Sequence, residues 1–229
     1  MLALLLALQI TVAPRAESSS AEAALLESAA AQLPGDARIA AQRLRFAIDD
    51  DDAPGAVEAA AACDQNAGYC GMLRGLVLQR AGRIAASDSA FRYALAVLPE
   101  PERRAWSDVS VLLEPELRRR YVNMTCAERA AFDERLWWLS DPLWSEPGNE
   151  RRAEQFARKV LVTILAPLGM DERQHWVPEK GGEAVAESLL RYGWPTQFYW
   201  AGVIVDNGYD AWLLKTAAVD TAQPYLVRE

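Results

Sequence analysis

The distribution of tryptophan is the feature of this sequence that most constrains its fold. Seven of the eight tryptophans lie beyond residue 130, and all eight lie beyond residue 105. Residues 18–100 are instead rich in alanine, and their apolar side chains recur at helical spacing. The change in composition predicts helical hairpins over 18–100, a connecting segment over 101–125 and a tryptophan-rich region over 126–229.

Helix starts and stops are recognisable along the first region. Ser19 and Glu22 form a capping-box pattern, which predicts a helix that starts there and ends at Pro34-Gly35. Further helices are expected over 36–48 and 54–63. The four aspartates at 49–52 lack the alternate ligand spacing of a calcium loop, so we interpret them as the cap of the next helix, with Pro54 in its first turn.

The best-defined unit of the first region spans residues 71–99. Gly75 would let two helices approach, Gly82 would end the first of them, and Pro99 would stop the second. This spacing resembles the tetratricopeptide repeat (TPR), a helical hairpin used as a binding scaffold. The matching positions are Gly75, Leu78, Gly82, Phe91, Ala94 and Pro99. The positions that depart from the repeat are Gly71, Arg74 and Ser87. The resemblance implies TPR-like helical hairpins, with residues 36–63 as a degenerate preceding hairpin.

The second region mixes helical and strand-like patterns. Thr125 and Glu128 form a capping box for a helix that runs to Leu139 and ends at Asp141-Pro142. A long amphipathic helix follows Asn149. Its apolar stripe is Phe156, Val160, Leu161, Ile164 and Leu168. Leu189–Tyr192 and Ala211–Leu214 resemble strands. The predicted fold class is mostly α (α+β): TPR-like helical hairpins, then a helical domain with a small C-terminal β-hairpin or sheet.

Residues 127–200 carry a second resemblance. In order they contain an aromatic helix (Phe132 to Trp138), Asp141-Pro142, the Pro147–Glu150 turn, a long helix, and a turn at Leu190–Pro195. This order resembles the GWxTD domain, an uncharacterised bacterial module often joined to TPR-like helices, and the organisation is similar to that of proteins of the Gemmatimonadota. The tetrad that names the family is not intact, because Gln174–Pro178 stands in its place. The resemblance implies a fold and secretion. The family has no established activity that could be carried over to this chain.

The tryptophans have two interpretations. Trp137 and Trp138 are adjacent on a helix and point about 100° apart, so only one of them can face the core. In the first interpretation, the indoles form a large aromatic core held by proline turns. In the second, they line a ligand groove. The residues of that groove would be Trp138, Trp144 and Trp194, with Arg151 and Arg152 as polar anchors.

Two features of the sequence, an apolar N-terminal run and a pair of cysteines, bear on the cellular compartment. Residues 2–13 form an apolar run that is too short for a transmembrane helix, which needs about twenty residues. The run is typical of a signal peptide over residues 1–16; the alternative is an N-terminal helix that packs on the core. Cys63 and Cys70 flank a turn-rich segment between two helices, so they form either a disulfide or a pair of buried thiols. Export and a disulfide support each other.

Most catalytic classes lack the required residues. The single histidine, His175, has loop-like neighbours and is interpreted as structural or exposed. No phosphate-binding glycine motif occurs, and neither a metal site nor a cofactor is predicted. Asp133 and Glu134 are expected on the solvent-exposed side of their helix, and Asp141 is expected to cap a turn. The net charge of −8 disfavours nucleic acid as a partner.

Together these patterns predict a non-enzymatic, exported scaffold of the cell envelope that binds a protein or peptide on the concave face of its helical hairpins. Neither a transmembrane span nor a nucleic-acid partner is expected. The alternative is an envelope hydrolase or carbohydrate-binding protein that uses the tryptophan-lined groove.

Overall fold

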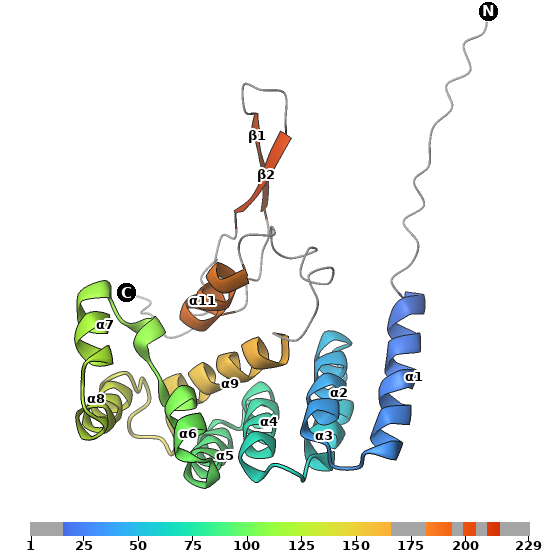
Figure 1. The fold of residues 1–229 in the computed structure, drawn as a ribbon, viewed down its shortest axis with the longest axis horizontal. Helices are drawn as coiled ribbons and strands as arrows, with labels where there is room; N and C mark the ends of the chain where they lie inside the picture. The colour runs from blue at the N-terminus through green and yellow to red at the C-terminus, as the bar shows by residue number, and fades with distance from the viewer. Residues whose placement is uncertain (1–15, 166–181, 194–198, 205–209, 216–229) are drawn as a thin grey trace, which may run out of the picture.

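The computed structural model of the chain describes residues 16–165, 182–193, 199–204 and 210–215. In these ranges the protein is mostly helical, and successive helices stand side by side in a row (Figure 1). The helices are α1 (Ala16–Gln32), α2 (Ala37–Asp49), α3 (Ala53–Ala62), α4 (Ala67–Arg80), α5 (Ile84–Val97), α6 (Glu100–Ser107), the 3₁₀ helix η1 (Ser110–Leu112), α7 (Pro115–Val122), α8 (Cys126–Leu139), α9 (Glu150–Leu165) and α11 (Gly182–Tyr192). The strands are β1 (Tyr199–Ile204) and β2 (Asp210–Lys215), which pair antiparallel with Tyr199 opposite Lys215.

Local capping explains several helix boundaries. Asp52 accepts a hydrogen bond from the backbone N–H of Gly55 at the start of α3, as expected from the aspartate run. Thr125 and Glu128 form the predicted capping box of α8. Gly82 follows α4 with a φ of +69°, a left-handed conformation that favours glycine. These three boundaries therefore confirm the sequence interpretation.

Two predicted boundaries are wrong. Helix α1 begins at Ala16, so Ser19 lies inside it and does not cap it. Leu189–Tyr192 lies at the end of helix α11 and is not a strand. Ala211–Leu214 lies within strand β2.

Helices α4 and α5 form a closely packed antiparallel pair. A methyl group added at Gly75 would lie 2.4 Å from Cε1 of Phe91, so α5 could not approach α4 as closely if residue 75 had a side chain. The hydroxyl of Ser87 donates a 2.7 Å hydrogen bond to the carbonyl oxygen of Gly75, which satisfies a buried polar group on α5. The serine that departs from the TPR pattern thus serves the same helix contact.

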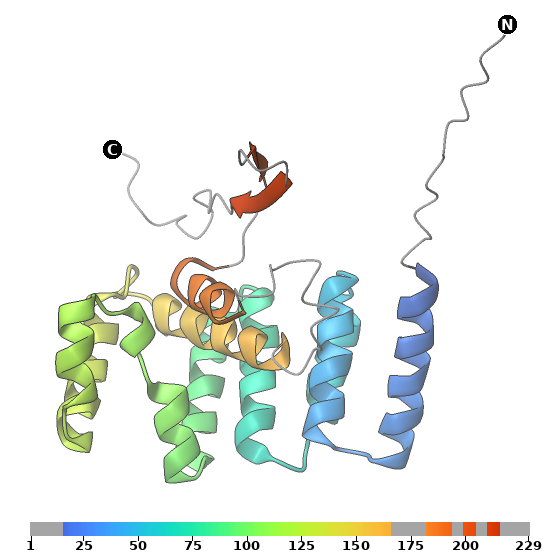
Figure 2. The same ribbon diagram turned by 45° about the horizontal axis from the view of Figure 1, so that its top comes forward.

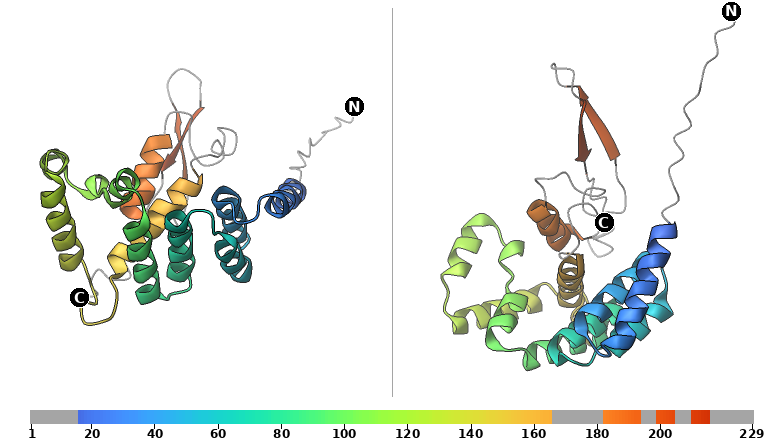
Figure 3. Two further views of the ribbon diagram at one scale, coloured as in Figure 1. Left: turned by 60° about the horizontal axis from the view of Figure 1, so that its bottom comes forward. Right: turned by 45° about the vertical axis from the view of Figure 1, so that its right-hand side comes forward.

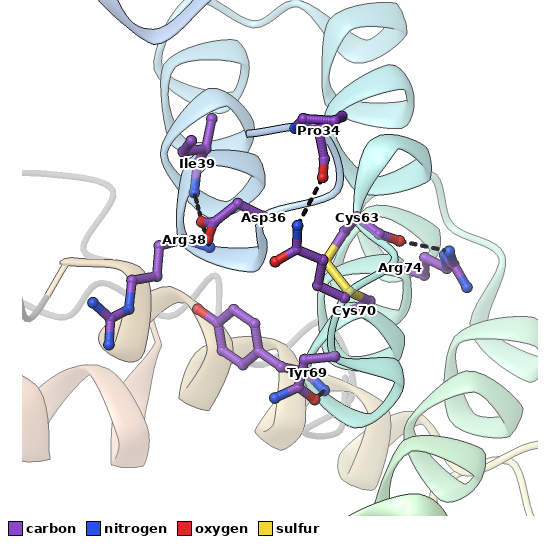
Figure 4. Close-up of a disulfide and its surroundings, with 10 residues drawn as sticks. Pro34, Asp36, Arg38, Ile39, Cys63, Tyr69, Cys70 and Arg74 are labelled. Carbon is purple, nitrogen blue, oxygen red and sulfur yellow. Dashed lines mark hydrogen bonds between the residues drawn. A yellow bond between two sulfur atoms is a disulfide. The ribbon is translucent and has the colours of Figure 1, made fainter. Parts of the chain in front are cut away.

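A disulfide joins the end of α3 to the first turn of α4. The Sγ atoms of Cys63 and Cys70 are 1.99 Å apart, their Cα atoms are 5.4 Å apart, and both residues are buried (Figure 4). Arg74 donates a 3.0 Å hydrogen bond to the carbonyl oxygen of Cys63 across the same junction. Closing so short a loop lowers the entropy of the unfolded chain, which stabilises the folded state by about 2.5 kcal/mol on the chain-entropy model. The junction between the two helical pairs is therefore fixed covalently.

Helix α9 crosses the row of helices and shares their core. It lies across α4 and α5 in Figures 1 and 2, and the right-hand view of Figure 3 shows α9 and α11 inside the curve that the other helices form. Phe156 of α9 stacks on Phe91 of α5 with ring centroids 5.5 Å apart. The inner face of the hairpins, expected to receive a partner, is thus covered by the chain's own helix. One hydrophobic cluster runs from Ala40 to Ile164, so the two predicted regions share a core.

Candidate binding surface

The segment from Trp137 to Asn149 forms a closed loop. The Asn149 side chain donates a 2.7 Å hydrogen bond from Nδ2 to the carbonyl oxygen of Trp137, and its Oδ1 accepts one from the backbone N–H of Arg152. Gly148 has a φ of +104°, and a methyl group there would lie 2.8 Å from the Cα of Ala85. The backbone of the loop is thus held against the start of α5. We call residues 138–149 the tryptophan loop.

The two adjacent tryptophans of α8 point in different directions, as their spacing predicts. Trp137 is buried in a second hydrophobic cluster with Val109, Leu113 and Tyr121. Trp138 is 72% exposed, and Trp144 is 81% exposed. The interpretation of these indoles as members of an aromatic core is therefore wrong for Trp138 and Trp144, because most of each side chain is exposed to solvent.

Leucines accompany the exposed indoles. Leu139 is 63% exposed and Leu143 is 43% exposed. Four large apolar side chains are thus presented to solvent within residues 138–144. Exposed apolar residues scattered singly are ordinary, but a concentration of this kind on one loop is typical of an interaction surface.

An open concavity lies beside the tryptophan loop. One side is the α4–α5 turn and the start of α5, and the other is the second half of the loop with the start of α9. The lining residues are Gly82, Arg83, Ile84, Ala85, Ala86, Leu143, Glu146, Pro147 and Glu150. We call this space the loop concavity. It is wide and shallow, which suits a side chain of a larger partner better than an enclosed small molecule.

The structure describes only part of the predicted ligand groove. Trp194 lies outside the described residues, as does His175. Trp138 and Trp144 are exposed but do not line the loop concavity. Arg151 lies half-buried in the first turn of α9.

Arg152, the second predicted anchor, is engaged inside the protein. Its Nε donates a 2.6 Å hydrogen bond to Oδ1 of Asp88, and its Nη2 donates a 2.7 Å bond to Oδ2. From the sequence alone, Asp88 was missed as the partner of Arg152. The available signal was the position of Asp88, three residues before Phe91 on the buried stripe of α5.

A buried polar network lies under α7, α8 and α9. Lys159 donates 2.5 Å hydrogen bonds to the carbonyl oxygens of Trp106 and Asp108, and burial lowers its pKa to about 8. Asp133 accepts a 3.3 Å hydrogen bond from the Tyr121 hydroxyl. Asp133 was predicted on the solvent-exposed side of its helix. It lies half-buried, because α8 turns this side toward Tyr121 of α7.

Asp133 gives the network a dependence on pH. Burial raises its pKa from 3.8 to about 6, Tyr121 and the cations Lys159 and Arg129 oppose the rise, and Asp108 adds to it. The folded state holds the proton more tightly than the unfolded chain does. The stabilisation that comes from the proton on Asp133 is therefore complete below about pH 4 and is lost as the pH rises through about 6.

Substituting Asp133→Asn is expected to raise the melting temperature at neutral pH and to leave it almost unchanged near pH 4. The gap between variant and wild type should widen from about pH 4 to pH 6 and then stay constant, since only the ionised carboxylate is costly to hold in this environment. Calorimetry across this pH range measures the difference in melting temperature between the variant and the wild type. Glu134→Gln, on the exposed side of α8, is the control. A gap that does not vary with pH would contradict the role given to Asp133.

The described ranges hold neither a group of metal ligands nor a helix of transmembrane character. No three His, Cys, Asp or Glu side chains there are grouped to hold a metal ion. No helix in the described part of the chain combines the length and apolar character needed to cross a membrane. No protein-family model, curated protein or solved structure matches the chain. The functional proposal therefore depends on the geometry of the tryptophan loop and the loop concavity.

Proposed function

We propose that this protein is an exported, non-enzymatic scaffold of the bacterial cell envelope, which binds a protein or peptide through the tryptophan loop. The observation that carries the proposal is the exposure of Trp138, Leu139, Leu143 and Trp144 on a loop that is anchored at both ends. Tryptophan is enriched at the centres of protein interfaces because it buries a large area with few rotatable bonds. An anchored loop loses little further entropy on binding.

The surrounding fold is consistent with a scaffold. The paired helices α2–α3 and α4–α5 support the TPR-like interpretation, and the antiparallel β1–β2 pair supports the α+β class. Since α9 covers the inner face of these pairs, the proposal places the partner on the tryptophan loop and not on the concave face. The Cys63–Cys70 disulfide supports export, because such bonds persist in oxidising compartments.

The test is a binding assay with the double variant Trp138→Ala/Trp144→Ala. Immobilised protein is exposed to a solubilised envelope fraction of the bacterium that encodes it, and the retained partner is identified and retitrated in purified form. The double variant should bind it at least about tenfold more weakly, since interface tryptophans commonly contribute 2 kcal/mol or more. Its melting temperature should match that of the wild type, because both indoles are exposed.

The matched control is Tyr93→Ala/Val97→Ala, which removes two exposed apolar side chains from α5 while leaving the loop intact. Equal loss of binding in both double variants would contradict the proposal. The alternative, a carbohydrate-binding protein or hydrolase, predicts retention on a glycan array that the tryptophan variant loses. Turnover of a substrate that vanished with a single polar substitution near the loop would overturn the non-enzymatic assignment.

A further inference from the structure

The loop concavity combines an apolar wall with an excess of carboxylates. The tryptophan loop and the first residue of α9 carry Asp141, Glu146 and Glu150, and no lysine or arginine occurs between Leu139 and Glu150. Among the residues that line the concavity, Glu146 and Glu150 face a single cation, Arg83. Carboxylates therefore outnumber cations among the lining residues, in a protein whose net charge is −8.

Glu150 is an independent sign that a positive charge is missing from this place. Only 9% of the residue is exposed, and its Oε2 has no hydrogen-bond partner among the described residues. Burial, together with the hydrogen bond to Asp141 and its charge, raises the pKa of Glu150, while backbone hydrogen bonds from Glu150 and Leu143 oppose the rise. The net direction is upward, so the protein compensates the ionised form only in part. Buried carboxylates are ordinarily paired with a cation or hydrogen-bonded on both oxygens. A cation placed in the concavity would supply part of the missing compensation.

The apolar neighbours restrict what kind of cation can bind. Leu143 lines the concavity, and Trp144 lies next to it in sequence with most of its indole in solvent. Lysine and arginine side chains carry aliphatic stems that pack on apolar surface, and their charged ends bind carboxylates and indole faces. A partner segment that combines basic and apolar residues would satisfy both parts of this surface. An anionic membrane or a nucleic acid would be repelled by it.

We infer that the loop concavity takes a lysine or arginine side chain of a partner polypeptide, whose neighbouring apolar residues lie against Leu143 and Trp144. This assignment rests on the proposed function, and it names the chemistry of the partner that the tryptophan loop binds. The carboxylates select the basic residue, and the indole and leucine side chains supply most of the buried apolar area. The preorganised backbone of the loop, fixed by Asn149 and Gly148, holds the two parts together.

The test is a selection from a random linear peptide library displayed on phage, with the full-length protein as bait. Selection on the wild type, after depletion on Trp138→Ala/Trp144→Ala, should enrich peptides with an excess of lysine and arginine beside apolar residues. A synthetic peptide from this pool is then titrated against two single variants. Glu146→Lys is expected to weaken binding roughly three- to tenfold, and Arg83→Glu is expected to strengthen it by a similar factor. Both residues are exposed, so neither change should impair folding.

The control for net charge is Glu22→Lys on α1, at the far end of the row of helices (Figure 1), which should leave the affinity unchanged. Two failures are distinguishable. Failure to enrich any peptide on the wild type over the tryptophan variant would count against the proposed function. Enrichment of neutral or acidic peptides, or equal effects of Glu146→Lys and Glu22→Lys, would overturn the charge assignment while leaving the loop as a binding surface.

Discussion

Replacing Asp88 with alanine is expected to lower the free energy of unfolding by about 3–5 kcal/mol, which is among the largest single-residue effects in this fold. Asp88 is buried on α5, and both of its oxygens accept hydrogen bonds from Arg152 on α9. Removing the carboxylate leaves a guanidinium whose side chain is only 23% exposed without its counter-ion. The cost is therefore that of an unpaired, largely buried charge rather than that of the ion pair itself.

A double-mutant cycle in urea isolates this effect. Arg152→Met should be about as destabilising as Asp88→Ala, and the combined variant should lose much less than the sum of the two, because neither charge is then left unpaired. Arg104→Ala serves as the surface control, since the Arg104–Glu100 pair is about half exposed on both sides and should cost less than about 1 kcal/mol. Arg152→Met with wild-type stability but lost binding would restore the sequence-based view of Arg152 as a ligand anchor.

The predictable parts of this fold are those that local chemistry determines. The cap at Asp52, the capping box at Thr125 and the left-handed Gly82 were all recognisable because their partners lie within a few residues along the chain. The apolar stripe of α9 was equally clear, since its spacing matches a single buried helix face. The orientation of Trp137 against Trp138 also followed from helix geometry in outline, without indicating which of them faces inward.

The errors arise where tertiary contacts decide the outcome. Leu189–Tyr192 is a short apolar run, which periodicity alone assigns equally well to a strand or to the end of a helix. Arg152 and Asp88 are 64 residues apart, so no local pattern pairs them. Asp133 was placed in solvent because its helix has charged neighbours, and only the contact of α8 with Tyr121 of α7 brings it inside.

The candidate site also has one part that the local sequence predicts and another that depends on tertiary contacts. The stretch containing Trp138 and Trp144 was recognised from its composition as either a packed corner or a recognition surface. Composition did not reveal that both indoles are exposed, or that the α4–α5 turn, some 60 residues earlier, forms the opposite wall of the loop concavity. Nor could it show that α9 occupies the inner face of the hairpins. An amphipathic helix has an apolar stripe, but the stripe does not identify the surface that it covers.

Phe156→Ala tests that placement of α9, and the expected loss in the free energy of unfolding is about 3–5 kcal/mol. Phe156 is buried, stacks on Phe91 of α5, and belongs to the cluster that joins α9 to the hairpins. Truncation leaves a cavity that the stiff α4–α5 pair cannot close, because Gly75 already places these two helices at their closest approach. Thr163→Ala on the exposed side of α9 should change stability by less than about 0.5 kcal/mol.

Hydrogen exchange then distinguishes loss of α9 docking from general destabilisation. If α9 is a separately opening element on the inner face, Phe156→Ala should reduce amide protection in α9 more than in α3 and α4, which the Cys63–Cys70 disulfide joins. A uniform loss of protection across all these helices would show that α9 is an inseparable part of one cooperative core. In that case, the inner face of the hairpins could not become available to any partner without unfolding of the whole protein.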